Sequence, residues 1–147
     1  MKYLFSILVL FPFLVAAQTQ EKEAIQQVIQ EAYVEGLFNK GDVAAIRKGF
    51  HEQFMLLGRK ANTQQRTLTR DERNKIEEQK KNAGKNPPAD AYKVKVEFLR
   101  IDIVEEVASV KLAFYEGEKL AYIDFLALYK FEEGWEIMNK VYHTMPE

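Results

Sequence analysis

Residues 107–143, VASVKLAFYEGEKLAYIDFLALYKFEEGWEIMNKVYH, contain three runs rich in β-branched and aromatic residues, separated by a Gly-Glu and a Glu-Glu pair. A similar run over 92–104 precedes them, and a further Glu-Glu pair follows it. Short polar pairs between such runs predict tight turns between neighbouring strands. We therefore predict an antiparallel meander of four strands over 92–104, 107–116, 119–131 and 134–143.

Helices are predicted upstream of this meander. Apolar residues recur about every four positions from Ala24 to Leu37, which predicts an amphipathic helix over 19–40, capped by Thr19 and ended by Gly41. Further along the chain we predict a short helix over 43–48 capped by Asp42, strands over 50–57 and 66–68, and a helix over 70–82 that begins with a capping box. This order of elements is typical of the α+β class.

The N-terminus resembles a secretory signal peptide. Lys2 supplies a positive charge, residues 3–15 are uncharged and apolar, and Val15-Ala16-Ala17 fits a cleavage site. An apolar run of this length is shorter than the roughly 20 residues that a membrane-spanning helix needs. We predict cleavage after Ala17, export to the periplasm or the medium, and no membrane contact afterwards. The mature part, 18–147, is predicted to form a single domain.

Composition argues against several classes of function. The predicted mature chain is slightly acidic, with 20 basic and 22 acidic residues, and so lacks the basic footprint that nucleic acids require. The absence of Cys removes disulfides, thiol catalysis and zinc–thiolate sites. Ser109 is the one serine after Ala17, which argues against a serine triad. The sequence also lacks a phosphate-binding loop and paired metal-ligand spacings, so we predict neither a metal nor another cofactor.

Asp124 is the strongest candidate for chemistry, because it lies within the apolar stretch 120–128. A carboxylate among such neighbours is costly to bury unless it is paired. Two-residue turns would place it in a cross-strand row with Arg100, Lys111 and Val141, so an ion pair with Lys111 or Arg100 is the alternative to a general base.

Further polar and aromatic side chains, and one methionine, complete the candidate site. His51 could hydrogen-bond or shuttle protons beside Asp124, although an ordinary lining role is the alternative. The predicted ligand-binding residues are Tyr33, Met55, Arg100, Lys111, Tyr122, Asn139 and His143. Trp135 is interpreted as a core anchor. A phase change between residues 98 and 99 predicts a β-bulge there, and a one-residue slip elsewhere would exchange the two faces of the sheet.

The chain resembles the nuclear transport factor 2-like superfamily, whose cone-shaped fold ketosteroid isomerase and SnoaL-like polyketide cyclases also use. The resemblance is closest to its putative lumazine-binding branch and spans about residues 20–145. It is carried by Phe50-His51-Glu52-Gln53-Phe54, by Tyr122 to Leu128 and by Gly134 to Tyr142. It implies a curved antiparallel sheet wrapped around the first helix, with a ligand pocket inside the cone.

These observations favour an exported protein that binds a small apolar or aromatic molecule without a defined reaction. One alternative is a cofactor-free isomerase, cyclase or dehydratase that uses Asp124 as its base, with His51 or Tyr122 as partner. Another alternative is an interaction module without a ligand. Both faces of the predicted sheet are rich in apolar residues, so we also predict a homodimer formed through the sheet.

Overall fold

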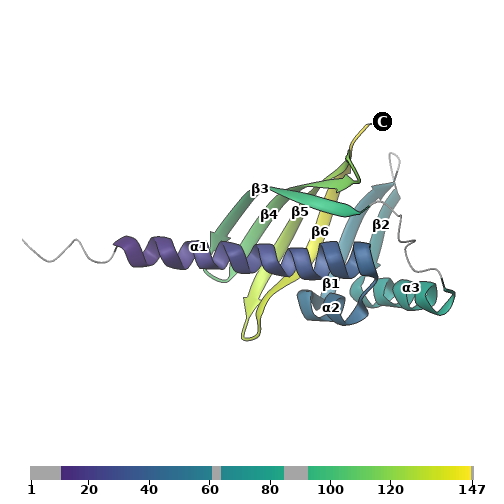
Figure 1. Cartoon of the computed structure of the whole chain (residues 1–147), viewed down its shortest axis with the longest axis horizontal. Helices are drawn as coiled ribbons and strands as arrows, with labels where there is room; N and C mark the ends of the chain where they lie inside the picture. Colours follow the sequence, from purple (N-terminus) through teal and green to yellow (C-terminus); the bar gives the residue numbers. More distant parts are fainter. Residues whose placement is uncertain (1–10, 61–63, 85–92, 147) are drawn as a thin grey trace, which may run out of the picture.

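The computed structural model describes residues 11–60, 64–84 and 93–146. A long helix lies in the hollow of a strongly curved sheet, and two shorter helices lie near one end of it (Figure 1). The helical elements are α1 (Phe11–Val28), η1 (Ile29–Lys40), α2 (Val43–Gly49) and α3 (Arg70–Asn82). The strands are β1 (Phe50–Lys60), β2 (Gln64–Thr69), β3 (Val94–Val104), β4 (Val107–Glu116), β5 (Lys119–Phe131) and β6 (Gly134–Thr144).

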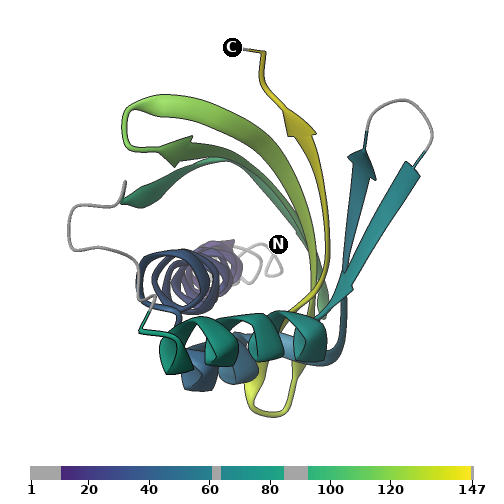
Figure 2. The ribbon, with the colours of Figure 1, turned by 90° about the vertical axis from the view of Figure 1, so that its right-hand side faces the viewer.

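The six strands form one sheet in the order β2-β1-β6-β5-β4-β3. Neighbouring strands are antiparallel, except that β1 pairs parallel with β6. The view along the long helix shows the sheet bending around it (Figure 2). The predicted α+β cone and its four-stranded meander are therefore confirmed, and all three predicted two-residue turns are present.

The long helix differs from its prediction at its start. It is already helical at Phe11, so Thr19 lies inside α1 and the prediction that Thr19 caps the helix is wrong. The apolar residues just before Thr19 continue the helix. The first ten residues of the predicted signal peptide lie outside the described part of the chain, and cleavage after Ala17 stays a prediction. None of the described helices is both long and apolar enough to cross a membrane.

The second half of the long helix, η1, has π-helical hydrogen bonding. Its wider turn buries three consecutive residues, Ala32, Tyr33 and Val34, on the side that faces the sheet. It ends at Gly41, which adopts the left-handed conformation (φ 62°). Short π-helical stretches often accompany functional sites, and here the stretch presents Tyr33 to the interior.

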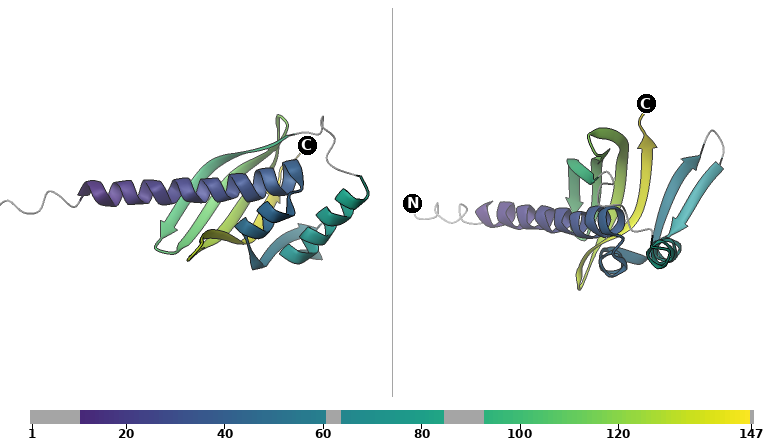
Figure 3. Two further views of the ribbon diagram at one scale, coloured as in Figure 1. Left: turned by 60° about the horizontal axis from the view of Figure 1, so that its bottom comes forward. Right: turned by 45° about the vertical axis from the view of Figure 1, so that its right-hand side comes forward.

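The two shorter helices begin where the sequence predicts. The Asp42 side chain accepts hydrogen bonds from the backbone of Ala44 and Ala45 at the start of α2. Thr69 and Glu72 form the predicted capping box of α3. Figure 3 shows α2 and α3 near the end of the long helix, beside the start of β1. Both helices contact β1, so they lie at one end of the cone.

Three β-bulges lie in the meander of β3 to β6 and set its register. The first lies between Phe98 and Arg100, where the change of phase predicts it. The second inserts Ala121 into β5, and the third inserts Met138 into β6. Each extra residue turns the following side chains to the opposite face. The bulges at Ala121 and Met138 therefore decide which residues of β5 and β6 point into the cone.

The core fills the space between the long helix and the concave face of the sheet. Its largest fully buried apolar side chains are Tyr33, Phe50, Phe114, Ile25, Ile29, Ile46, Leu112, Leu128 and Ile137. Trp135 is also buried, as predicted for a core anchor, and its indole N–H donates a hydrogen bond to Glu21 at 2.8 Å. This contact joins α1 to the turn between β5 and β6.

Candidate functional site

Three polar side chains meet inside the cone, in the middle of the apolar core. Tyr33 comes from η1, Asp124 from β5 and Lys140 from β6. The Tyr33 hydroxyl donates to Asp124 Oδ2 at 2.5 Å, and Lys140 Nζ lies 2.9 Å from the same oxygen. Lys140 Nζ also donates to the Tyr33 hydroxyl. Asp124 is fully buried, and Tyr33 and Lys140 are 1% and 5% exposed. We call these three residues the polar triad.

Burial governs the electrostatics of the triad. Loss of hydration, with the negative charge of Asp124 close by, raises the pKa of Tyr33 well above its ordinary value of 10. Tyr33 therefore remains a hydrogen-bond donor at neutral pH. Loss of hydration lowers the pKa of Lys140, although the neighbouring Asp124 opposes this effect. The triad thus combines a firmly held phenol proton with an amine whose positive charge depends on one carboxylate.

The two oxygens of Asp124 differ in their hydrogen bonding. Oδ2 interacts with both Tyr33 and Lys140, whereas the buried Oδ1 has no partner. A buried acceptor without a donor costs about 1–3 kcal/mol, and such atoms in folded proteins call for an explanation such as a bound water or ligand. A molecule that donates an N–H or O–H group to Oδ1 would therefore gain binding free energy by satisfying this buried acceptor.

Aromatic rings surround the amine of Lys140. Its Nζ lies 4.8–6.0 Å from the centroids of five rings, those of Tyr33, Phe38, Phe114, Tyr122 and Tyr142. Rings at this distance stabilise a cation through their negative faces. Tyr122 and Tyr142 pack edge to face at 5.5 Å and are only half-buried. Phe38 is half-buried as well, so these three rings are the neighbours of Lys140 that reach solvent.

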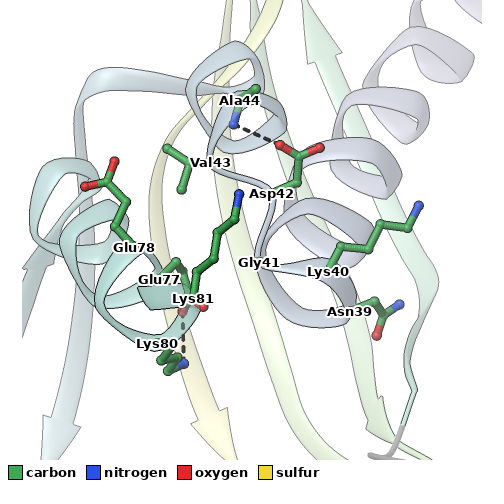
Figure 4. Close-up of a pocket in the computed structure, with 10 residues that line it drawn as sticks. All are labelled: Asn39, Lys40, Gly41, Asp42, Val43, Ala44, Glu77, Glu78, Lys80 and Lys81. Carbon is green, nitrogen blue, oxygen red and sulfur yellow. Dashed lines mark hydrogen bonds and ion pairs between the residues drawn. The ribbon is translucent and has the colours of Figure 1, made fainter. Parts of the chain in front are cut away.

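A hollow lies outside the cone, where the end of η1 and the start of α2 meet α3 (Figure 4). It measures 730 Å³, and its charged lining residues are Lys40, Asp42, Glu77, Glu78, Lys80 and Lys81. Glu77 is the buried member, and Arg73 and Lys80 already neutralise it at 3.2 and 3.0 Å. Because this groove contains both positive and negative side chains, its charge favours neither an anionic nor a cationic ligand. We therefore take the polar triad as the candidate functional site.

Helix α3 carries one more buried polar group without partners. Asn74 is 3% exposed, and both its amide nitrogen and its amide oxygen lack hydrogen bonds. Its neighbour Arg73 lies over the Phe38 ring at 5.6 Å, so this side of α3 faces the aromatic shell of the triad.

Among the described residues, no cluster of three or more His, Asp or Glu side chains could hold a metal ion.

The family follows from a comparison of the whole sequence with known protein families. Residues 20–143 match the family described as "Putative lumazine-binding". The chain belongs to this family. The match covers the long helix from residue 20 onward and the meander as far as residue 143, so it includes all three members of the polar triad. No protein among those with curated functions matches the sequence.

Solved structures support the same fold for this family member. A nuclear transport factor 2-like protein of unknown function from Shewanella baltica OS155 is similar at 26% identity, with 88% of this chain and 97% of that chain covered and a TM-score of 0.69. A protein of the same description from Silicibacter pomeroyi DSS-3 is 18% identical, with 87% and 98% coverage and a TM-score of 0.68. The predicted nuclear transport factor 2-like fold is confirmed, and neither relative has a known function.

Three of the predicted site residues meet inside the cone of this family member. Asp124 and Tyr33 belong to the polar triad, and the ring of Tyr122 lies beside Lys140 and packs against Phe114 at 5.5 Å. The predicted alternative of an ion pair for Asp124 is confirmed, but its predicted partners are wrong. Lys111 stands opposite Phe125 rather than Asp124, because the Ala121 bulge shifts β5 by one residue.

The remaining predicted ligand-binding residues lie on the outer face of the sheet or at its edge. Arg100 forms an ion pair there with Asp102 at 2.6 Å, and the amine of Lys111 covers the exposed ring of Phe125. The register places the others in the same outer rows: Met55, Asn139 and His143. The prediction that Arg100, Lys111, Asn139 and His143 share a face with Asp124 is wrong, and its cause is the pair of bulges in β5 and β6.

His51 also lies apart from the triad. Its ring stacks on Phe131 at 5.0 Å, near the turn between β5 and β6, and its Nδ1 accepts a hydrogen bond from the backbone of Gln53. Phe131 is seven residues from Asp124 along β5, a separation of roughly 23 Å in an extended strand. His51 therefore cannot act on Asp124 in this arrangement.

Sequence reasoning missed Lys140. The alternation that begins at Trp135 and Ile137 would turn Lys140 outward, but the Met138 bulge restores it to the inner face. One signal could have found it, since Lys140 is the only lysine or arginine in β6 and a buried carboxylate on the neighbouring strand requires a cation. Sequence patterns rarely reveal a bulge, and here the bulge determines the site.

Proposed function

We propose that this protein binds a small, flat aromatic molecule inside the cone and holds it by a hydrogen bond to Asp124 Oδ1. The observation that carries the proposal is the contrast between the two oxygens of Asp124, one with two partners and the other buried with none. A ligand N–H or O–H group would satisfy the free oxygen. The aromatic shell around it supplies apolar surface for a flat ring.

Lumazine is a suitable probe for this proposal. It is a flat bicyclic ring with two N–H donors, and the family description names it. Calorimetric titration of the wild-type protein with lumazine should give saturable binding. Asp124→Asn should weaken binding by about 1.5–3 kcal/mol, as expected for loss of a hydrogen bond to a charged group. The matched control is Asp102→Asn, on the exposed outer face, which should leave the affinity unchanged.

Two results would contradict this proposal. One is equal affinity of wild type and Asp124→Asn for a ligand that both bind. The other is the absence of any bound or bindable small molecule in native mass spectra of protein purified from its own host. Circular dichroism of each variant distinguishes lost binding from lost folding, and Tyr33→Phe provides a milder change in the same site.

The free oxygen of Asp124 also supports a second candidate function. A carboxylate that keeps one oxygen open could take a proton from a bound substrate, as the predicted isomerase, cyclase or dehydratase requires. In that case Asp124→Asn would retain ligand binding but lose turnover. If Asp124→Asn turned over a bound compound at the parental rate, this second candidate would fail.

The outer face of the sheet supports the predicted homodimer as a separate proposal. Two cross-strand pairs of exposed large apolar residues lie on it, Val107 with Tyr129 and Phe125 with Val141. Contact with a second copy would remove these side chains from water, which favours association. Phe125→Lys should therefore convert a dimer into a monomer in sedimentation measurements. A wild-type protein that sediments as a monomer would contradict the proposal.

A further inference from the structure

The amine of Lys140 has surroundings that differ from those of an ordinary structural ion pair. It is almost completely buried, and five aromatic rings lie around it. Its polar neighbours are one carboxylate oxygen, 2.9 Å away, and one phenol. The interior is thus built to hold a single positive charge at this nitrogen.

One part of these surroundings, the loss of hydration, also favours a nucleophilic amine. A lysine attacks only in its neutral form, and burial in an apolar pocket increases the share of that form. Burial does lower the pKa of Lys140. Asp124 Oδ2 lies at hydrogen-bond distance to receive the proton that the ammonium must release, and the Tyr33 hydroxyl contacts both groups. Nucleophile, proton acceptor and proton donor therefore meet at one point.

We propose that Lys140 forms a reversible Schiff base with an aromatic aldehyde or ketone that enters the cone. This inference rests on the proposed binding function and narrows its ligand class to carbonyl compounds. Two features support it beyond the amine itself. The rings of Tyr122 and Tyr142 beside the nitrogen are only half-buried, and the unpartnered Asp124 Oδ1 lies on the carboxylate that contacts the amine.

The reaction balances without a further reagent. The Lys140 ammonium gives a proton to Asp124, and the neutral amine adds to the carbonyl carbon to form a C–N bond. The carbonyl oxygen becomes a hydroxyl group after proton transfer from nitrogen. Asp124 then returns its proton to this hydroxyl group, the C–O bond breaks and water leaves. The product is a protonated imine and a carboxylate, so the net charge of the site is the same before and after.

Conservation of charge explains why this interior suits an imine. The iminium nitrogen keeps the positive charge that the aromatic rings and Asp124 stabilise in the free protein. The phenol of Tyr33 stays protonated, because its pKa is raised well above its ordinary value, and it can donate to the leaving oxygen. The protein therefore needs no new counter-ion when the covalent bond forms.

Reductive trapping tests the inference. The full-length protein is incubated with a limiting amount of 2-naphthaldehyde and sodium cyanoborohydride, and peptide mass spectrometry then locates the added naphthylmethyl group. Lys140 should carry more label than any exposed lysine, because burial lowers the pKa of Lys140 and so increases its share of neutral amine. Lys140→Arg should abolish this selective labelling, whereas Lys111→Arg should leave it unchanged.

The wild-type map alone can overturn the inference, even if Lys140→Arg fails to fold. Label distributed over exposed lysines with none on Lys140 would exclude the Schiff base. The proposed binding function would survive that result if native mass spectra still showed a non-covalent ligand that depends on Asp124. An absence of both label and ligand would contradict the two proposals together. Slower labelling of Lys140 in Tyr33→Phe would support the assigned role of the phenol.

Discussion

The two faces of the sheet carry the same kind of ion pair in opposite surroundings. Inside the cone, Asp124 and Lys140 lie 2.9 Å apart and are almost completely buried; outside, Asp102 and Arg100 lie 2.6 Å apart with their side chains half or more exposed. The outer pair has the shorter distance, yet water screens it and its contribution to stability is small. The inner pair has lost its hydration, so each charge depends on the other.

The comparison shows that the distance between two charges does not by itself determine how much their ion pair affects stability. The outer pair has the shorter distance between its charged atoms. Only in the inner pair, however, does the loss of one partner leave a buried charge and destabilise the fold. It also indicates which of the two carboxylates can bind a ligand. A buried carboxylate with one open oxygen can hold a ligand firmly, whereas an exposed one remains satisfied by water. The predictions below test this comparison, from the largest expected effect to the smallest.

The largest effect is expected for Lys140→Met. The substitution leaves Asp124 charged and without its cation in the core, which should lower the free energy of unfolding by about 3–5 kcal/mol. Urea denaturation at pH 7 measures this loss. Lys111→Met, on the outer face of the sheet, is the control and should change stability by no more than about 0.5 kcal/mol. Equal losses in the two variants would contradict the comparison.

Removing both charges should restore most of this stability. Replacement of a buried ion pair by apolar residues of similar volume is often neutral or even stabilising. The double variant Lys140→Met/Asp124→Leu should therefore be within about 1–2 kcal/mol of wild type, although it should lose the ligand. A double variant as unstable as Lys140→Met would mean that the pair itself, rather than its unpaired charge, stabilises the fold.

Tyr33→Phe should cost about 1.5–3 kcal/mol at pH 7, because it removes a hydrogen bond to a charged group. The pKa of Tyr33 is raised above its unfolded value of 10, so its contribution is complete below pH 10 and declines as the pH rises further. Denaturation curves between pH 8 and 11 should therefore converge for wild type and Tyr33→Phe at the alkaline end.

Asn74 provides an intermediate case, because it is buried and polar but has no charge. Asn74→Leu removes two unsatisfied atoms and should raise the free energy of unfolding by about 1 kcal/mol. Thermal denaturation would detect this gain. The exposed Asn82 on the same helix is the control, since Asn82→Leu should leave stability nearly unchanged. A loss of stability in Asn74→Leu would indicate that the amide has partners in solution, such as water.

The smallest effect is expected for Asp102→Asn. Its ion pair with Arg100 is exposed, and pairs of this kind contribute about 0–1 kcal/mol. The difference from wild type should shrink further in high salt, because salt screens exposed charges. A loss as large as that of Lys140→Met would remove the distinction between the two faces of the sheet.

Much of the fold could be predicted from local sequence signals. Capping residues and polar turn pairs located α3, β4 and β5 at their observed bounds, because those signals act through neighbouring residues. The site was only partly predictable. The apolar surroundings of Asp124 are visible in the sequence, but its partner Lys140 is not, because the Met138 bulge that turns Lys140 inward depends on how β5 and β6 pair.

The central claim is that Asp124 holds a small molecule inside the cone. Native mass spectra of wild type, Asp124→Asn and Asp102→Asn, each purified from the protein's own host, test it most directly. We predict a bound small molecule on wild type and Asp102→Asn, and its loss from folded Asp124→Asn. An empty wild type, or a ligand that Asp124→Asn retains in full, would contradict the claim.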